Sequence, residues 1–541
     1  MNRYRRPGED PDVSTTSTPA PAPVAGPALP GRAISALIGV LAVWAALGVG
    51  HLAAGLISPA SSPYLAVGDT VIRFSPEPVT EFAKVTFGTA DKPILLGGMF
   101  VVITLVAAVA GLLSRRRPGP GVTAVVVLGL LGLAAVVFAP TFAPLDLVAP
   151  VLSIAAGVAA FRWLHGLAVR ATAPAAAPAG GVSRRTVLAG ASAAVGVGAV
   201  AAAGVGQLLA GGVSSSRDTA TAALRGATLA ERAPAVPAGA AFPQFGTPTF
   251  LTSNADFYRI DTALRIPSIS AASWRLKLHG MLGTPVTLTY DDLLSRRLVE
   301  RTITMTCVSN PIGGNLISTA NFVGVELRDV LMQAGIDPAA DALYSTSADG
   351  WATATPMATL LEPGRGALLA VGMNGEALPP EHGFPVRMVV PGLYGYVSAT
   401  KWVVDLEATT FANPDKQGYW YQRGWAQKAP IKTMTRIDSP QPFGRAPAGD
   451  VTIAGIAWAQ HTGIAAVEVA VDGGAWQRAT LSDEVNVDAW RMWHTTFRLT
   501  PGSHSIQARA TDKSGAVQTE QRADPIPDGA SGWPNVIFNV A

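Results

Sequence analysis

The sequence predicts a multi-domain protein: a five-helix transmembrane region, then an α+β domain, then a β-sandwich. Three observations support this fold class. Five long apolar runs lie within residues 34–210, and alternating and helical patterns mix between about 250 and 435. From about residue 440 onward, short alternating runs are separated by turn residues. At 541 residues the chain is also too long for one ordinary domain.

The N-terminal part predicts a tail followed by membrane spans. Residues 1–33 are rich in Pro, Ala, Ser and Thr and begin with three arginines, which is typical of a disordered cytoplasmic tail. The apolar runs at 34–57, 93–113, 121–140, 145–165 and 186–210 each approach the ~20 residues that span a bilayer core. A buried core helix is the alternative for any single run, but five runs almost free of charge together favour membrane helices.

Charge predicts the orientation of these spans. Residues 1–217 carry 15 basic and 8 acidic residues, a net charge of +7, whereas residues 218–541 carry 25 and 29, a net charge of −4. The loops after the second and fourth spans are basic (Arg115, Arg116, Arg117, Arg170, Arg184 and Arg185). Because such loops remain in the cytoplasm, five crossings place everything after about residue 211 outside. The basic excess therefore indicates a lipid bilayer, and not nucleic acid, as partner.

Two features of the membrane part bear on its role. Ser183-Arg184-Arg185-Thr186, before the fifth span, resembles an internal twin-arginine export signal; the alternative is an ordinary basic pair on the cytoplasmic side. His51 and His165 lie near opposite ends of their spans, too far apart in depth to clamp one haem. We therefore expect the helices to anchor the protein or dock a partner.

The remaining chain divides by composition. Residues 211–245 are rich in Ala, Gly, Pro and Ser and predict a linker, followed by the α+β domain at 246–438 and the sandwich at 439–541. In the α+β domain, strands are expected at Trp274–Leu278 and Arg301–Thr306, and a helix at Leu327–Ala334. The runs that predict the sandwich are Val451–Trp458, Ala466–Val471, Trp493–Leu499 and His504–Ala510.

Cys307 is the single cysteine, which excludes an intramolecular disulfide and any zinc or iron–sulfur site built from thiolates alone. The alternation from Thr302 to Thr306 predicts a half-buried strand that delivers Cys307 at its end. The loop that follows contains Gly313 and Gly314, so a bulky group could approach the sulfur. Three roles stay open from the residues alone: a soft metal ligand, a nucleophile or a buried small side chain.

A second group of residues suits an anion. His382, Arg387 and Lys401 lie within about twenty residues and are separated by turn formers. Arg offers a forked contact to phosphate and Lys a point charge. The alternative for any one of them is solvated surface charge.

In order along the chain, these residues resemble the sulfite-oxidase-like molybdopterin enzymes, over about residues 245–541. The matching stretches are Phe257-Tyr258-Arg259, Trp274-Arg275-Leu276, the loop at Cys307, Asn321–Leu331, Met373-Asn374-Gly375 through Lys401-Trp402, Val451–Trp458, Val471-Asp472-Gly473-Gly474 and Trp490-Arg491-Met492-Trp493. The resemblance implies a molybdenum–molybdopterin cofactor, with an α+β domain that binds it. It also implies that the C-terminal domain is the family's immunoglobulin-like, dimerisation-type module, so that a homodimer is an expectation.

The resemblance also implies site residues. Cys307 is expected to ligate molybdenum and, with Arg259, to serve catalysis. The residues expected to hold the cofactor are Asn254, Tyr258, Arg259, Cys307, Asp349, His382, Arg387, Thr400 and Lys401.

Departures from the family pattern concern the substrate. Pro311 stands where the animal enzymes have an anion-binding arginine, no arginine lies near Thr462-Gly463, and Trp351 stands in place of an active-site tyrosine. The function that the resemblance implies is oxygen-atom transfer on a small substrate, which the predicted topology places outside the cytoplasm, with an unidentified electron-transfer partner. The departures leave the substrate undecided between a sulfoxide and sulfite. Two rivals are a hydrolase with Cys307 as nucleophile and His382 as base, and a non-enzymatic binding module.

Overall fold

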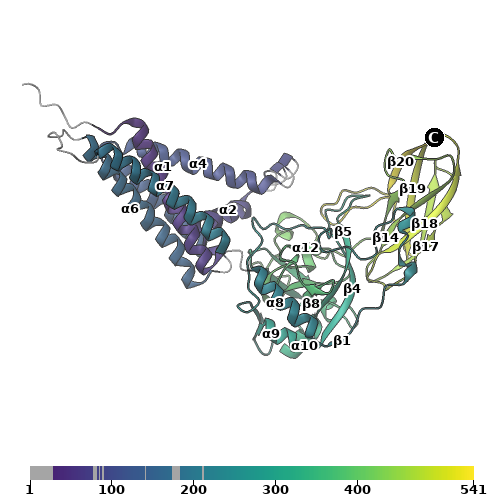
Figure 1. Cartoon of the computed structure of the whole chain (residues 1–541). Coiled ribbons are helices and arrows are strands. Elements are labelled where there is room, and N and C mark those ends of the chain that lie inside the picture. The colour runs from purple at the N-terminus through teal and green to yellow at the C-terminus, as the bar shows by residue number, and fades with distance from the viewer. Residues whose placement is uncertain are drawn as a thin grey trace, which may run out of the picture.

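The computed structural model describes residues 29–76, 90–139, 142–172, 183–209 and 213–541, together with residues 79, 82–83 and 86–87. Three units follow one another in chain order, with helices at one end, an α+β unit in the middle and a β unit at the other end (Figure 1). Most of the predicted tail, residues 1–28, lies outside the described residues.

Within the described residues, five helices are long and apolar enough to cross a membrane: Arg32–Ile57, Asp91–Leu113, Gly119–Val137, Pro144–Thr172 and Arg185–Gly206. They correspond to α1 (Arg32–Ile57), α4 (Asp91–Leu113), α5 (Gly119–Val137), α6 (Val148–Thr172) and α7 (Arg184–Leu209). The five predicted apolar runs therefore form helices, with ends within three residues of those expected except at the fourth, whose helix continues seven residues beyond the predicted end to Thr172.

Helix α1 lies at the centre of this bundle and packs against α4, α6 and α7. Glycines make the approach close. A Cβ on Gly39 would lie 2.0 Å from the carbonyl oxygen of Ala107, and one on Gly48 would lie 2.4 Å from that of Ala199. Small residues that let helix backbones meet are the usual means of association where the surroundings are as apolar as the side chains.

A shorter helix, α2 (Pro63–Phe74), lies between α1 and α4 in the chain. It begins at Pro63, whose fixed φ and missing N–H suit the first helical position. It is not among the candidate spans within the described residues.

The α+β unit contains two mixed sheets. The first has the order β1 (Leu229–Glu231), β4 (Leu298–Thr306), β5 (Ile317–Glu326), β8 (Leu368–Met373) and β10 (Arg387–Val389), and β9 (Glu376–Ala377) also pairs with β8. The second has the order β3 (Val286–Thr289), β2 (Arg275–Gly280), β11 (Val403–Thr409), β6 (Ala342–Ser347) and β7 (Ala352–Pro356). The register of β4 against β5 pairs Thr304 with Thr319, which brings the end of β4 beside the start of β5.

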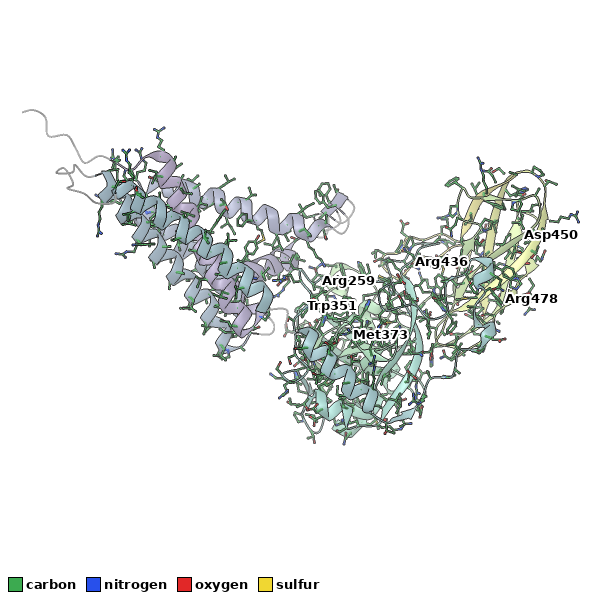
Figure 2. All side chains as sticks on the ribbon, viewed as in Figure 1. Arg259, Trp351, Met373, Arg436, Asp450 and Arg478 are labelled. Atoms are coloured by element: carbon green, nitrogen blue, oxygen red, sulfur yellow. The ribbon has the colours of Figure 1, made fainter. Side chains whose placement is uncertain are left out.

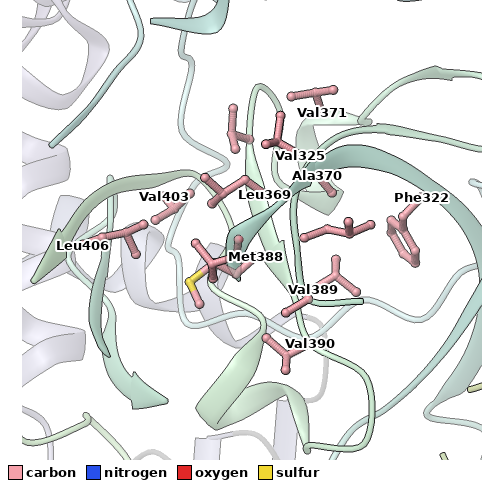
Figure 3. Packing of buried hydrophobic residues seen from close by; sticks show 14 of the residues in the cluster. Phe322, Val325, Leu369, Ala370, Val371, Met388, Val389, Val390, Val403 and Leu406 are labelled. Carbon is pink, nitrogen blue, oxygen red and sulfur yellow. The ribbon is translucent and has the colours of Figure 1, made fainter. Parts of the chain in front are cut away.

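Apolar side chains from both sheets form one core. Phe322, Leu369 and Met388 come from the first sheet, and Val403 and Leu406 from the second; all five are fully buried (Figure 3). At roughly 1.5–3 kcal/mol for each large apolar side chain removed from water, this core fixes the two sheets relative to each other.

Short helices cover the sheets: α9 (Tyr290–Leu294), α10 (Leu327–Ala334), α11 (Met357–Leu361) and α12 (Gly395–Ser398). α10 has the bounds that its apolar spacing predicts, and it ends at Gly335, whose φ of 73° is the left-handed conformation that glycine adopts easily. α9 is capped by Thr289, whose hydroxyl accepts a bond of 3.0 Å from the N–H of Asp292.

The predicted linker at 211–245 is partly folded. It contains α8 (Val213–Gly226) and β1, and Ala220 and Leu224 of α8 lie in the core of the α+β unit. Arg217 fixes α8 to the α+β unit, because its guanidinium donates hydrogen bonds to the carbonyls of Ala377 and Leu378. The linker prediction was therefore wrong for α8 and β1, because an Ala- and Ser-rich composition suits a helix that packs closely as well as it suits a loop.

The C-terminal unit consists of two sheets that pack face to face. One has the order β12 (Met434–Ser439), β14 (Gly449–Trp458), β18 (Arg491–Leu499) and β17 (Thr480–Leu481). The other has the order β13 (Arg445–Ala446), β20 (Asn535–Val540), β19 (Gly502–Asp512), β15 (Ile464–Val471) and β16 (Gln477–Arg478). Ile453 and Trp493 from the first sheet meet Val467 and Phe538 from the second in one core.

Candidate active site

Cys307 lies directly after β4, at the point where the strand meets a tight loop. Its side chain is 8% exposed. Its N–H donates to the carbonyl of Leu316 at 3.0 Å, and its own carbonyl accepts from the N–H of Asn310 at 3.1 Å. The side-chain oxygen of Asn310 in turn accepts from the N–H of Leu316 at 2.9 Å. The loop is therefore closed on itself and holds the thiol in one place.

Two tyrosines lie near the sulfur. Burial raises the pKa of Tyr258 well above its ordinary value, and negative charge at Cys307 raises it further. The pKa of Tyr394 is raised to about 12, first by burial and then by the charges of Asp528 and Cys307. Both phenols stay protonated at neutral pH and can donate hydrogen bonds.

Arg387 and His382 are both buried; the charge of Tyr258 acts on Arg387, and the ring of His382 lies 5.4 Å from that of Phe257. Arg387, 4% exposed, donates through Nη1 to the carbonyl of His382 at 3.1 Å. Burial lowers its pKa to about 10, against the opposing effect of Tyr258. His382, 3% exposed, donates through Nε2 to the carbonyl of Asn254 at 2.9 Å. Burial, and then the charge of Arg387, lower its pKa to about 4, so the ring is neutral at pH 7.

A second cluster surrounds Asp261, whose side chain is only 5% exposed. One carboxylate oxygen accepts from Lys401 at 3.1 Å and from Arg259 at 2.9 Å, and the other accepts from Lys92 at 3.1 Å. Burial alone would raise the pKa of Asp261, but the three cations together hold it well below its usual range. Burial lowers the pKa of Lys401 to about 8, against the opposing charge of Asp261.

Lys401 connects the two clusters. Its Nζ also donates to the carbonyl of Glu381 at 3.0 Å, next to His382. Gly383, with a φ of 111°, packs between the two cations: a Cβ there would lie 3.0 Å from that of Arg387 and 3.2 Å from that of Lys401. Arg259 and Trp351 lie on the side of the α+β unit nearest the helices (Figure 2).

The other predicted residues are held by internal bonds. The amide of Asn254 donates to Glu376 at 2.6 Å and accepts from Asn374 at 2.8 Å. Burial raises the pKa of Asp349, which accepts from the N–H of Trp351 at 3.0 Å and feels the charges of Asp261 and Lys401.

Thr400 is fully buried, and its hydroxyl shares a 2.6 Å hydrogen bond with Ser345. The structure therefore uses this hydroxyl within the core beside Lys401.

The strand that leads to Cys307 is buried on both faces, and the prediction of a half-buried strand was wrong. The reason is that the C-terminal unit covers its threonine face. The N–H of Thr304 donates to the carbonyl of Asp488 at 2.9 Å, and its hydroxyl accepts from the N–H of Trp490 at 2.7 Å. The polar groups on this face of the strand therefore form their hydrogen bonds with the C-terminal unit and not with water.

Comparison with known proteins agrees with this geometry. Residues 263–420 match the model of the oxidoreductase molybdopterin binding domain. The chain is 28% identical over 322 residues to sulfite oxidase of Gallus gallus, covering 51% of this chain and 69% of that protein. It is 32% identical over 152 residues to the uncharacterized oxidoreductase YuiH of Bacillus subtilis, covering 28% of this chain and 72% of YuiH.

The chain belongs to the sulfite-oxidase-like molybdopterin oxidoreductases. It spans 59% of the length of the mitochondrial sulfite oxidases of mouse and human. A solved structure, the sulfane dehydrogenase SoxCD from Paracoccus pantotrophus, is similar at 24% identity with a TM-score of 0.48, covering 56% of this chain and 88% of that one.

The site fits the family's molybdenum–molybdopterin cofactor. A thiolate is a soft, charged ligand that suits a transition metal, and Cys307 is the one thiol of the chain. Three cations around a single carboxylate leave a charge of +3 − 1 = +2. A phosphate group, at about −1.5 to −2 near neutral pH, would balance that excess.

Sequence reasoning missed two members of this site, Asp261 and Lys92. Asp261 had a local signal, since it lies two residues after Arg259. Lys92 had none, because it is 169 residues from Asp261 in the chain and only the fold brings them together.

Proposed function

We propose that this oxidoreductase is anchored in a membrane and transfers an oxygen atom to or from a small substrate outside the cytoplasm, with Cys307 as the metal ligand. The observation that carries the proposal is the buried thiol at the end of β4, held by its loop beside Tyr258. The cofactor, when bound, supplies oxygen-atom transfer coupled to a two-electron change at molybdenum.

Each neighbouring residue has a part in this proposal. Cys307 binds the metal as thiolate, and its closed loop keeps the sulfur from turning away. Tyr258, Asn254, His382 and Arg387 would hold the pterin, to which the buried guanidinium and the neutral imidazole could offer hydrogen bonds.

The cation cluster holds the other end of the cofactor. Lys401 and Arg259 attract the phosphate, and Arg259, the more exposed of the two at 44%, also attracts an anionic substrate. Asp349 and Thr400 position Lys401. Asp349 acts by its charge, and Thr400, the preceding residue, is fixed by the hydrogen bond of its hydroxyl with Ser345.

Two reactions are proposed as the candidates. Sulfite plus water gives sulfate, two protons and two electrons, and the electrons pass to a partner. In the opposite direction, a sulfoxide plus two protons and two electrons gives a sulfide and water. The departures at Pro311 and Trp351 leave the second as open as the first.

The hydrolase alternative has less support. His382 directs Nε2 to a backbone carbonyl, and the family is one of oxidoreductases.

Full-length chain from a cofactor-producing host tests the proposal. Molybdenum and pterin are measured per chain, sulfite oxidation with a dye acceptor, and sulfoxide reduction with a reduced viologen. We expect one of the two reactions in the wild type and at least ~100-fold loss in Cys307→Ser, with Ser309→Ala in the same loop as control. Full molybdenum without either reaction contradicts the proposed chemistry, and an active Cys307→Ser contradicts the ligand.

The location is part of the proposal. Five candidate spans and their basic loops support a cytoplasmic N-terminus, an outside position for residues after about 211, and export by the twin-arginine signal at Arg184-Arg185. Export of the folded domain should fail in the double variant Arg184→Lys, Arg185→Lys. Normal export of that variant would leave only an ordinary basic pair.

The domain limits and the C-terminal module are likewise proposed. We place the cofactor domain at 246–433, extended by α8 and β1, and an immunoglobulin-like module at 434–541, which we propose as a homodimer surface; the boundary expected at 438/439 moves because β12 pairs with β14 of the C-terminal sheet. Light scattering of the detergent-solubilised chain at several concentrations checks the dimer.

A further inference from the structure

Two segments of the helical region contact the α+β unit. In α2, the carboxylate of Asp69 accepts a hydrogen bond from the N–H of Leu264, and a Cβ on Gly68 would lie 2.6 Å from a methyl group of Leu264. At the end of α2, the carbonyl of Arg73 accepts from the guanidinium of Arg423 at 3.3 Å. The second segment is the first turn of α4, which carries Lys92. The helices therefore reach the cofactor domain itself.

Lys92 enters the cation cluster from this side. Its Nζ lies 3.1 Å from Oδ1 of Asp261, while Lys401 and Arg259 occupy Oδ2. The side chain of Lys92 is 25% exposed and that of Asp261 is 5% exposed. An ordinary surface ion pair contributes little to stability and needs no third or fourth partner. This one is shared and largely removed from water.

The charge balance is the decisive feature of the cluster. Three cations share one buried carboxylate, which leaves an excess of +2 among these four groups; Arg387 adds to the positive field at Lys401, and burial raises the pKa of Asp349, the other carboxyl group that acts on the cluster, which disfavours its charged form. Cations held close together out of water repel one another unless an anion offsets them. A second anion at this place would remove the repulsion, and a phosphate carries about the charge required.

We propose that Lys92 binds the anionic end of the cofactor together with Lys401 and Arg259, so that the helical region completes the cofactor site. The inference rests on the proposed function, because it takes the Asp261 cluster as the place of the cofactor phosphate. It gives the helices a part beyond anchoring, because the first turn of α4, at the start of the second candidate span, supplies a cation to one end of the cofactor site.

The test measures cofactor release from the full-length chain in detergent. Wild type, Lys92→Met, Lys92→Arg and the exposed-lysine control Lys428→Met are loaded with cofactor in the same host, diluted, and filtered at intervals. Retained molybdenum and released pterin give a dissociation rate for each. We expect the cofactor to be released at least ~10-fold faster from Lys92→Met, because this variant loses one charge-assisted contact. Release from Lys92→Arg and Lys428→Met should stay within about 2-fold of the wild-type rate.

Release from Lys92→Met at the wild-type rate overturns the proposal and leaves the lysine as a docking contact only. Lys92→Gln is a second neutral variant, and gel filtration confirms that each variant is folded before the rates are compared. A failure of the proposed function would look different. If the wild type retained its cofactor but catalysed no oxygen-atom transfer, the proposed reaction would be contradicted and the role of Lys92 would not.

Discussion

The side-chain amide of Gln460 donates to the hydroxyl of Thr306 at 2.9 Å, one residue before the proposed metal ligand. The same nitrogen lies 3.2 Å from the carbonyl of Thr304, and Gln460 is 4% exposed. A residue of the C-terminal unit thus supports the strand that ends at Cys307.

We expect Gln460→Ala to lower the stability of the protein by about 1–3 kcal/mol, because a buried hydroxyl and a carbonyl lose their donor. Thermal melting of the holoprotein measures the change, with the exposed Gln521→Ala as control. Equal melting temperatures for the two variants would show that water replaces the amide without cost.

Gly383 is expected to tolerate no side chain. Its φ of 111° is strained for any other residue, and a Cβ would press on Arg387 and Lys401. We expect Gly383→Ala to cost roughly 2–4 kcal/mol from strain and overpacking together. Gly313→Ala is the matched control, since its φ of 76° is also left-handed but its Cβ would meet nothing within 4 Å. If both variants lost the same stability, the effect would come from backbone strain alone and not from contact with Arg387 and Lys401.

His382 predicts a loss of stability in acid. Burial lowers its pKa to about 4 in the folded protein, from 6.5 in the unfolded chain. A depressed pKa contributes stability that is present above the unfolded value and lost as the pH falls through the folded one. Up to about 3 kcal/mol should be lost between those limits.

Melting temperatures from pH 7.5 to 4 in wild type and His382→Asn check this expectation, and the variant should show the smaller slope. His504 is the control of opposite sign, because the Thr500 carbonyl and then Asp472 raise its pKa. Its contribution is present at low pH and lost as the pH rises. Parallel curves for wild type and His382→Asn would refute the assignment.

Asp69 predicts that the contact between α2 and the α+β unit depends on pH. Its pKa is raised to about 6, first by burial and then by the charge of Asp349, while Arg73, the Leu264 N–H and Arg265 act against the rise. Because the folded value lies above the unfolded value, the stabilisation is complete below about pH 4 and is lost as the pH rises through about 6.

Protease cleavage within residues 63–76 measures this contact. The ratio of wild-type to Asp69→Asn cleavage should increase as the pH rises from about 5 to 7, since the amide does not ionise. A constant ratio would mean that Asp69 keeps one protonation state throughout.

Local patterns predicted the elements well, and contacts between units account for what they missed. The helix Leu327–Ala334 was predicted with its observed bounds because its apolar spacing is a local signal. The burial of β4 was misjudged because its threonines are satisfied by residues about 155–185 positions away. Lys92 was missed for the same reason, because charge pairing across 169 residues leaves no periodic trace, whereas Asp261, two residues after Arg259, had a local signal that was not used.

The hydrogen bonds from the C-terminal unit to β4 have a consequence for how the protein loses its structure. Thr304 and Thr306 are held by Asp488, Trp490 and Gln460, and the strand they belong to ends at the thiol. Melting of the C-terminal unit would strip these partners from a buried strand and leave its polar groups unsatisfied. We therefore expect the two units to unfold together as one cooperative block, so that a destabilising change in the C-terminal unit also loosens the strand that positions Cys307.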